Sequence, residues 1–406
     1  MILSLPPMLL AVLLQAQARL PDPTMLPVAS AQPPAVAKWA ALRVASMSAG
    51  QSYYDPTTGV RIWKVSSAST PEPNTGAGHD YADGGQQVSR GWGNRSGSHT
   101  ILVRVNGAPY WLVDFDRGFG LRNWRRLPPE AQPASDLCFT FANDPQTPRI
   151  AYIYNGRQLI RFNTAMMRVE NLGGFPKTLP SGTWLQQDMN DSWFVKLAGE
   201  NTVIAWNAKT GVQFSQSWNG INEGRLERNG RYVALGGGTL GTRIWDLQSN
   251  TVSSAYTGFP FAHNASPRGH WIATNWDLSA PWALERLDPT GGAVQIHAPS
   301  FGTDLHHSGS WIQGDAELGG DLLRQWTIAS TYKSIDPRVL LQNAIGYVRS
   351  DGSDVRLLAH TYQAGDSYWS LPFATSSPDG RVVIFNSNMM SPAGRTDLFV
   401  IEVPAR

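Results

Sequence analysis

Short apolar runs that end in an acidic residue or asparagine recur along the chain and predict repeated β-strands. A short turn and a further strand follow most of these runs, which are rich in β-branched and aromatic residues. The ends of successive runs are separated by 47, 44, 39, 42, 63 and 51 residues. Such a period is typical of one repeated four-stranded sheet. The seven runs are Trp111–Asp116, Leu159–Asn163, Val203–Asn207, Arg243–Asp246, Leu284–Asp288, Tyr347–Asp351 and Phe399–Glu402.

A second pattern, a polar turn followed by a strand-like run, precedes each of these segments. Glycine or asparagine in the turn supplies the positive φ that a tight hairpin needs. Because the two patterns stay in phase seven times, the sequence predicts an all-β fold, a seven-bladed β-propeller over residues 51–406. The turns are Asn94–Gly97, Asn143–Pro145, Asp188–Asp191, Glu227–Gly230, Ser266–Gly269, His306–Gly309 and Ser377–Gly380.

The two ends of the repeat predict how the ring closes. After Glu402 only four residues follow, too few for an outer strand. Near the other end, the turn Asp55–Gly59 and the strand-like residues 60–66 match the turn and outer strand that begin at Asn207. We therefore expect an N-terminal strand to complete the last blade and to protect its edge. The 63-residue step predicts an insertion in the sixth blade, within residues 325–343.

The N-terminus has the pattern of an export signal. An apolar run, Leu5–Leu14, precedes Ala16-Gln17-Ala18, a small-x-small cleavage site, although no Lys or Arg precedes the run. The run is shorter than the roughly 20 residues that span a bilayer. We expect a signal peptide at 1–18, a Pro/Ala-rich extended linker at 19–50, and a periplasmic or secreted protein without a membrane span. The alternative is a disordered apolar N-terminus.

Composition excludes two classes of protein. Lys plus Arg number 33 and Asp plus Glu 31, which gives a net charge of +2. The chain therefore lacks the excess of basic residues expected of a nucleic-acid-binding protein. With 42% hydrophobic residues, the chain can bury a core and is not intrinsically disordered. The only cysteine, Cys138, stands in an apolar run, so we expect it to be buried and unpaired, in a monomer.

Two motifs carry a resemblance to known families. Ser377-Pro378-Asp379-Gly380 and Ile244-Trp245-Asp246 resemble the repeats of WD40-like and TolB-like propellers. Gly78-His79-Asp80-Tyr81, together with the histidine-rich turns, is similar to secreted propellers of the oligogalacturonate-lyase type. The second resemblance implies a divalent metal that acidifies the sugar carbon beside a uronate carboxylate.

The channel mouth is the expected ligand site, because propellers bind ligands where the innermost strands end. Counting back five residues from each turn glycine, or from Asp191 in the third blade, selects one residue per blade. This set is either a ligand-binding ring or a solvated structural ring. It comprises Trp92, Gln186, Arg225, Asn264, Asp304 and Thr375.

Histidines in two adjacent blades are candidate metal ligands. His263 and the pair His306–His307 fall at the inner ends of their blades, with Asp304 as a further oxygen donor. Neutral imidazoles that converge there can bind a divalent metal. No local motif fixes a ligand spacing, so a metal is one interpretation and no cofactor is certain.

A glycine-rich segment, residues 68–88, precedes the first complete blade and is long enough to cover the channel mouth. His79 and Tyr81 within it could act as base and acid in proton abstraction, with Arg225 neutralising a carboxylate. Alternatively, His79 and Tyr81 hold the segment in place by hydrogen bonds.

Two functions of different class follow from these features. The slightly favoured one is an exported, non-catalytic propeller that binds a glycan or a protein at the channel mouth. The alternative is a polysaccharide lyase that acts on a uronate. Among the tryptophans, Trp92, Trp276 and Trp369 lie nearest to turns and are the candidates for sugar stacking.

Overall fold

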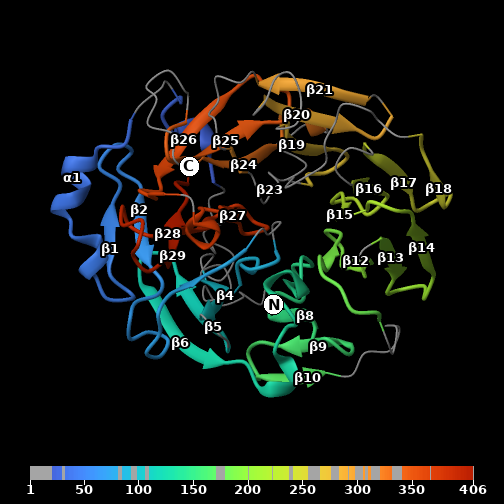
Figure 1. The fold of residues 1–406 in the computed structure, drawn as a ribbon, viewed down its shortest axis with the longest axis horizontal. Coiled ribbons are helices and arrows are strands. Elements are labelled where there is room, and N and C mark those ends of the chain that lie inside the picture. Colours follow the sequence, from blue (N-terminus) through green and yellow to red (C-terminus); the bar gives the residue numbers. More distant parts are fainter. Residues whose placement is uncertain are drawn as a thin grey trace, which may run out of the picture.

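The strands of this computed structural model form seven antiparallel sheets arranged around a ring (Figure 1). The predicted all-β, seven-bladed propeller is therefore confirmed. The structure describes residues 21–29, 33–80, 85–92, 98–105, 109–170, 179–199, 201–221, 223–236, 241–254, 266–275, 283–290, 292–297, 305–306, 310–311, 321–331, 341–365 and 367–405.

Blades 1 to 4 each contain four strands in chain order from the channel outward. Blade 1 contains β3 (Ala77–Gly78), β4 (Ser98–Val105), β5 (Tyr110–Asp116) and β6 (Gly120–Arg126). Blade 2 contains β7 (Phe139–Phe141), β8 (Ile150–Tyr154), β9 (Leu159–Asn163) and β10 (Arg168–Glu170). Blade 3 contains β11 (Gln186–Gln187), β12 (Trp193–Ala198), β13 (Thr202–Asn207) and β14 (Gln213–Ser217). Blade 4 contains β15 (Glu223–Leu226), β16 (Tyr232–Gly236), β17 (Arg243–Asp246) and β18 (Thr251–Val252).

The other three blades depart from this scheme within the described ranges. Blade 5 contains β19 (Trp271–Asn275), β20 (Ala283–Asp288) and β21 (Gly292–His297). Blade 6 contains β22 (Leu305–His306), β23 (Ser310–Trp311), β24 (Trp326–Thr331), β25 (Ala344–Arg349) and β26 (Val355–His360). Blade 7 contains β27 (Thr375–Ser376), β28 (Val382–Ser387), β29 (Asp397–Glu402), β2 (Arg61–Lys64) and β1 (Ser52–Tyr54). A six-residue helix, α1 (Val36–Ala41), precedes β1, and short 3₁₀ turns occur at Pro23–Met25, Val44–Ser46, Pro129–Ala131, Asp136–Cys138, Leu322–Arg324 and Tyr368–Ser370.

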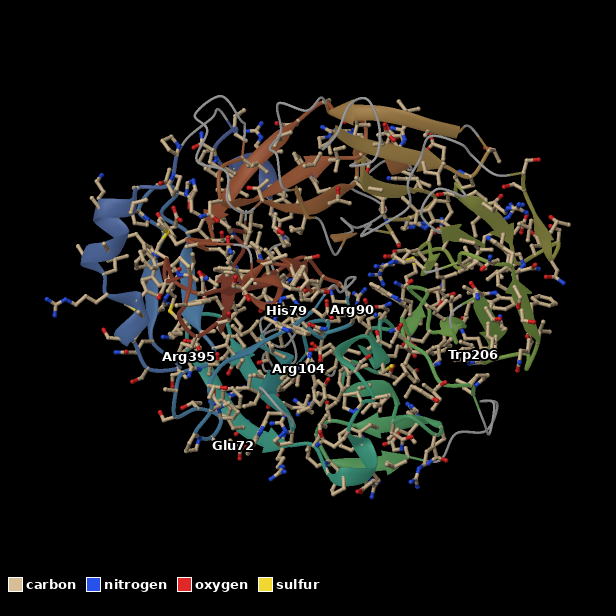
Figure 2. The ribbon with its side chains drawn as sticks, viewed as in Figure 1. Glu72, His79, Arg90, Arg104, Trp206 and Arg395 are labelled. Carbon is tan, nitrogen blue, oxygen red and sulfur yellow. The ribbon has the colours of Figure 1, made fainter. Side chains whose placement is uncertain are left out.

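The repeated apolar run lies on the same strand of every blade, for example on β13 and β17 in blades 3 and 4. These strands are buried because neighbouring blades cover both of their faces. Trp206 stacks on Phe194 with ring centroids 5.5 Å apart, and Phe194 meets Tyr152 of blade 2 edge to face at 4.8 Å. In Figure 2, Trp206 lies toward the outer side of the ring, whereas His79 and Arg90 lie toward its centre.

The polar turns also join neighbouring blades. Asp379 in blade 7 accepts a hydrogen bond from the backbone N–H of Gly91 at 2.9 Å and pairs with His99 Nε2 at 3.0 Å. Glu227 in blade 4 accepts from the N–H of Gly269 in blade 5 at 2.8 Å. Asp191 in blade 3 accepts from the N–H of Asn143 in blade 2 at 2.9 Å. The turn carboxylates therefore fix the spacing between blades as well as the hairpins.

Blade 6 differs from the sequence prediction in where its strands lie along the chain. Of the turn predicted at 306–309, His306 belongs to β22 and residues 307–309 lie outside the described ranges. Both β22 and β23 pair with the same strand, β24. The blade strand β24 itself lies at 326–331, inside the range 325–343 that was expected to be an insertion. The strand-like run that follows the predicted turn gives only the short β23, and Trp326–Thr331 is the strand that pairs with β25. Residues 332–340 of the expected insertion lie outside the described ranges.

The ring closes through an N-terminal strand, as the sequence predicts. β2 pairs antiparallel with β29, with Ile62 opposite Ile401, and β1 adds a fifth strand on the outside. Lys64 Nζ lies 3.1 Å from Asp397 Oδ2, and both side chains are fully buried. Lys64 Nζ also donates to the carbonyls of Val44 and Ala45. A buried ion pair that spans the closure therefore ties the two ends of the domain together.

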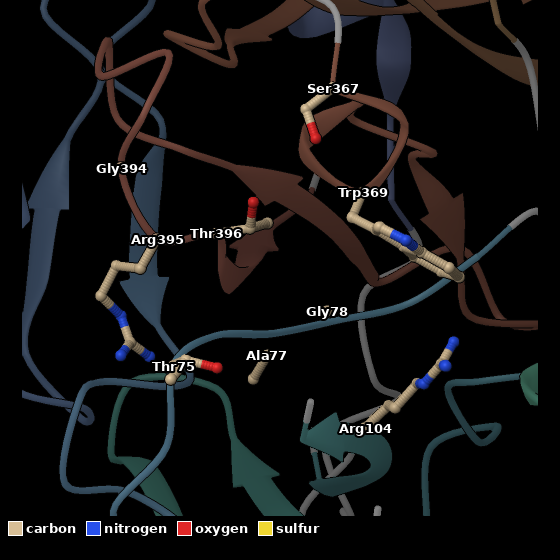
Figure 3. Close-up of a pocket in the computed structure, with 9 residues that line it drawn as sticks. All are labelled: Thr75, Ala77, Gly78, Arg104, Ser367, Trp369, Gly394, Arg395 and Thr396. Carbon is tan, nitrogen blue, oxygen red and sulfur yellow. The ribbon is translucent and has the colours of Figure 1, made fainter. Parts of the chain in front are cut away.

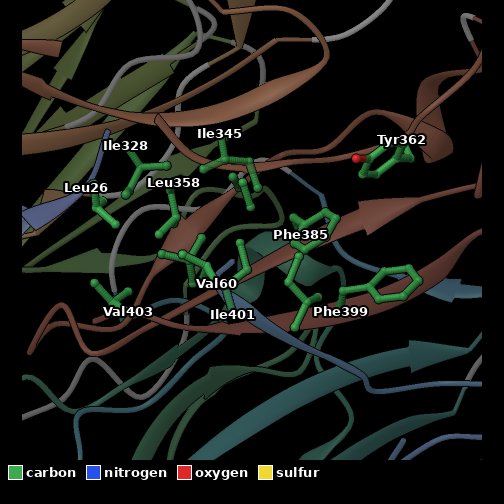
Figure 4. Close-up of a cluster of buried hydrophobic side chains, with 14 of the residues drawn as sticks. Leu26, Val60, Ile328, Ile345, Leu358, Tyr362, Phe385, Phe399, Ile401 and Val403 are labelled. Atoms are coloured by element: carbon green, nitrogen blue, oxygen red, sulfur yellow. The ribbon is translucent and has the colours of Figure 1, made fainter. Parts of the chain in front are cut away.

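The described part of segment 19–50 packs against the propeller and differs from the extended linker predicted for it. Pro21 forms a β-bridge with Ala405, and Val28 one with Arg356. Trp39 of α1 stacks on Tyr362 at 4.6 Å with an interplanar angle of 13°. Leu26, Trp39 and Val44 belong to an apolar cluster that includes side chains of blades 6 and 7 (Figure 4). Proline content alone did not reveal that these three side chains would be buried.

Two smaller expectations concern Cys138 and the membrane. Cys138 is fully buried and unpaired, as predicted, and its thiol contacts the Ser135 hydroxyl and the Gly182 carbonyl. Across the described ranges, no helix has the length and the apolar character needed to cross a membrane.

We expect Lys64→Met to destabilise the fold by about 3 kcal/mol, because it leaves the buried Asp397 carboxylate with Arg395 as its remaining cation. Lys209→Met, at an exposed turn position, should change the free energy of unfolding by less than about 0.5 kcal/mol. Urea denaturation of both variants measures the difference. Equal stability of the two variants would contradict a structural role for the closing ion pair.

Burial raises the pKa of Asp191 to about 7, so the folded protein holds a proton there that the unfolded chain releases near pH 4. The stability from this group is complete below pH 4 and is lost as the pH rises through 7. The difference in free energy of unfolding between Asp191→Asn and wild type should therefore shift in favour of the variant as the pH rises from 4 to 8, because the amide does not titrate. The pKa of Asp351 is lowered, so Asp351→Asn should give no such gain. Urea titrations at several pH values test both signs.

Candidate functional site

The upper mouth is defined here as the end of the channel at which the innermost strands begin. The segments that border these strands meet there: His79–Asp80 between β3 and the inner residues 87–89, which also bond to β4, Asp136–Cys138 before β7, Trp184–Leu185 before β11, Glu223 at the start of β15, and Tyr368–Ala374 before β27. The polar turns lie at the opposite end. Side chains at the upper mouth therefore come from blades 1, 2, 3, 4 and 7.

Three residues of the predicted ring lie on innermost strands, as expected, but they are buried. Gln186, Arg225 and Thr375 belong to β11, β15 and β27. Gln186 accepts a hydrogen bond from the N–H of Leu226 at 3.1 Å, which ties blade 3 to blade 4. Trp92 is half-buried beneath the guanidinium of Arg149 at 3.6 Å, at the turn end of blade 1. Asn264 and Asp304 lie outside the described residues.

Arg225 is held inside the protein. Its side chain is 1% exposed, its Nε donates to Glu223 Oε2 at 3.2 Å, and its guanidinium lies 4.0 Å from the ring of Trp184. Its Nη1 has no partner among the described residues. In this conformation the guanidinium contributes a buried cation to the channel wall and does not reach a ligand in solvent.

His79 connects its segment to blade 7. Its N–H donates to Asn386 Oδ1 at 3.1 Å, and Asn386 Nδ2 donates to the His79 carbonyl at 2.6 Å. Burial lowers the pKa of His79 to about 3, against the opposing hydrogen bonds from the Asp80 carbonyl and Gln87. The imidazole is therefore neutral and enclosed at physiological pH. Tyr81, its predicted partner, lies outside the described residues.

The predicted metal ligands lie almost entirely outside the described ranges. His263, His307 and Asp304 are not described, and for His306 only the backbone is, as part of β22. Within the described ranges, no three His, Cys, Asp or Glu side chains are grouped as a metal site requires. The metal site stays a prediction from the sequence.

The structure brings together two tyrosine–carboxylate pairs that sequence reasoning missed. Tyr368 donates to Asp80 Oδ1 at 2.5 Å, joining blade 7 to blade 1, and Tyr110 donates to Asp136 Oδ1 at 2.5 Å. Burial raises the pKa of Asp136, while the Arg104 guanidinium at 3.4 Å opposes this effect. Burial and then the Asp80 carboxylate raise the pKa of Tyr368, so both hydroxyls are permanent donors at neutral pH.

A cavity of about 290 Å³ opens beside these pairs, at the boundary between blades 7 and 1 (Figure 3). Arg104 lies 4.6 Å from the ring of Trp369, which is 47% exposed. Arg395 on the other side is held by Asp397 at 2.7 Å and by the carbonyl of Asn74 at 3.0 Å. None of the described lining residues is acidic. The lining consists of Thr75, Ala77, Gly78, Arg104, Ser367, Trp369, Gly394, Arg395 and Thr396.

The described lining of this cavity combines positive charge, hydroxyl groups and an aromatic ring. Two guanidinium groups line it. All three nitrogens of Arg395 donate to Asp397 or Asn74, whereas only Nη1 of Arg104 donates to Asp136, so Nε and Nη2 of Arg104 have no hydrogen-bond partner in the described part of the chain. Three hydroxyl side chains complete the wall, and Trp369 supplies an exposed aromatic face. Of these residues the sequence singled out Trp369 alone. Arg104, near the end of β4, and Arg395, just before β29, lie on other parts of their blades, and no repeated sequence signal marks them.

The fold is that of a known class of propeller. The chain is similar to the solved structure of an oligogalacturonate lyase in complex with manganese, at 11% identity and a TM-score of 0.56, over 88% of this chain and 99% of that one. It is also similar to the oligogalacturonate lyase of Vibrio parahaemolyticus, at 10% identity and a TM-score of 0.57, over 88% and 98% of the two chains. At this identity the similarity shows the seven-bladed architecture. The sequence matches no family model, and no curated protein matches it.

The buried state of His79 can be tested without a ligand. We expect its imidazole NMR signals to stay constant between pH 5 and 8, because its pKa is about 3. Comparison with the spectrum of His79→Gln assigns the signals. A titration with a midpoint near 6.5, the ordinary value for histidine, would show instead that the ring is solvated and available as a base.

Proposed function

We propose that the protein is an exported, non-catalytic propeller that binds an acidic glycan at the upper mouth. The observation that supports this most directly is the cavity between Arg104 and Arg395, which has an exposed tryptophan and no acidic residue in its described lining. Guanidinium groups recognise carboxylates in a planar, two-bonded geometry. An aromatic ring beside them offers the apolar face on which a sugar ring stacks.

The ligand groups are positioned before binding. Arg104 is fixed by the Asp136 carboxylate and by the Trp369 ring, and Arg395 by Asp397 and Asn74. Side chains that are already ordered lose little entropy on binding. The Tyr110 hydroxyl in turn holds Asp136. This arrangement favours binding by a rigid surface.

The lyase interpretation has less support from the described residues. Elimination from a uronate needs a base that reaches the sugar, whereas His79 and Arg225 are both enclosed. What favours the alternative is the similarity of the fold to oligogalacturonate lyases. If the protein is such an enzyme, the predicted ligands His263, His306, His307 and Asp304 would hold the metal, and Tyr81 would complete the reacting groups.

Titration calorimetry with oligogalacturonate tests the binding proposal. Trp369→Ala and Arg104→Ala should each weaken binding by about 10- to 100-fold, because they remove the stacking face and one cation of the site. Arg126→Ala, an exposed arginine of the same blade, is the matched control and should bind as wild type. Equal affinity of all three variants would rule out this cavity as the site.

A parallel assay separates binding from catalysis. The proposal predicts no ultraviolet absorbance from an unsaturated uronate when the protein is incubated with polygalacturonate, with or without added manganese. Absorbance that disappears in the double variant His263→Ala, His306→Ala would establish the lyase alternative in place of the binder.

A further inference from the structure

A second groove, of about 460 Å³, lies on the outer part of the ring between blades 3 and 4. It is separate from the upper mouth, because the two open at opposite ends of equivalent strands. Trp193 is the first residue of β12, the second strand of blade 3, whereas Arg104 is the penultimate residue of β4, the second strand of blade 1. The groove is lined by Trp193, Asn207, Thr210, Val212, Phe214, Gly230, Arg231, Leu247 and Gln248.

The floor of the groove is aromatic. Trp193 and Phe214 are stacked with centroids 6.1 Å apart and an interplanar angle of 21°, and Phe214 rests edge to face on the buried Trp245. The first position of the second strand is filled by Trp271 in blade 5 and by Val382 in blade 7, and both are fully buried. In blade 3 the tryptophan is only half-buried. Tyr232, at the same position of blade 4, is half-buried too, so blades 3 and 4 both leave aromatic surface at this edge of the ring.

The walls are rigid and carry amide groups. Asn207 Oδ1 accepts hydrogen bonds from the N–H groups of Lys209 and Thr210, each at 3.0 Å, and this fixes the turn on the blade 3 side. Neither Asn207 Nδ2 nor the side-chain amide of Gln248 has a hydrogen-bond partner in the described part of the chain. Amides beside an aromatic face suit the paired hydroxyls of a sugar, which both donate and accept hydrogen bonds.

The charge of the groove selects against an anion. Its one charged lining residue, Arg231, is neutralised by Asp246 at 3.1 Å. The volume falls within the range of small-ligand sites, about 300–1,000 Å³. We propose that this groove is a second binding site, specific for a neutral sugar unit, whether or not the upper mouth binds an acidic glycan.

Four neutral probes test the proposal: cellohexaose, xylohexaose, mannohexaose and maltohexaose, titrated against the full-length protein by calorimetry. We expect at least one to bind, and Gln248→Ala to weaken that binding by about tenfold, because the exposed amide contributes hydrogen bonds without supporting the fold. Phe214→Ala should weaken it further. Gln158→Ala, an exposed glutamine of blade 2, is the matched control and should bind as wild type.

Four results would overturn the proposal. One is that none of the four hexasaccharides binds. The second is that binding is unchanged in both Gln248→Ala and Phe214→Ala. The third is that saturating polygalacturonate displaces the hexasaccharide, which would place the hexasaccharide at the upper mouth. The fourth is dimerisation that Val212→Glu abolishes, because the groove would then be covered by a second copy of this chain. Thermal unfolding of each variant confirms that it is folded.

Discussion

The pairing of β2 with β29 is the contact on which the whole ring depends. Seven sheets can surround a channel only if the last blade is completed, and here the completing strand comes from the other end of the domain. The Lys64–Asp397 ion pair lies inside this contact, where two buried charges are tolerable only as partners. The N-terminal segment then covers the closed blade through Leu26, Trp39 and Val44.

The closure and the proposed binding site share a residue. Asp397 pairs with Lys64 on one side and with Arg395 on the other, and Arg395 lines the cavity proposed to bind an acidic glycan. Asn386, on β28 of the same blade, binds the backbone of His79 and so positions the segment that carries Asp80. The cavity is therefore formed where blade 7 meets blade 1, and its geometry depends on the correct completion of the ring.

Burial also divides the polar residues of the channel by role. Arg225, Gln186 and His79 are enclosed and serve mainly to hold blades together, although they have chemically versatile side chains. Arg104 and Trp369 remain partly exposed and can meet a ligand. Inner strands are narrow and crowded, so their side chains contact one another, whereas the segments that precede them lie at the rim. This is why counting positions along the innermost strands selected structural residues for the most part.

The sequence by itself determined the repeat, the number of blades, the closing strand and the burial of Cys138. These features depend on local patterns of apolar residues and turns, which every blade repeats. Only the tertiary structure decided which side chains converge. Tyr368 and Asp80 are separated by 288 positions, and Trp369 meets Arg104 across the same boundary between blades. The tertiary structure also decided which residues form the strands of blade 6 and how residues 21–29 and 33–50 pack on the propeller. Contacts between blades depend on how far each strand is displaced along its neighbours, and no local pattern of residues encodes that displacement.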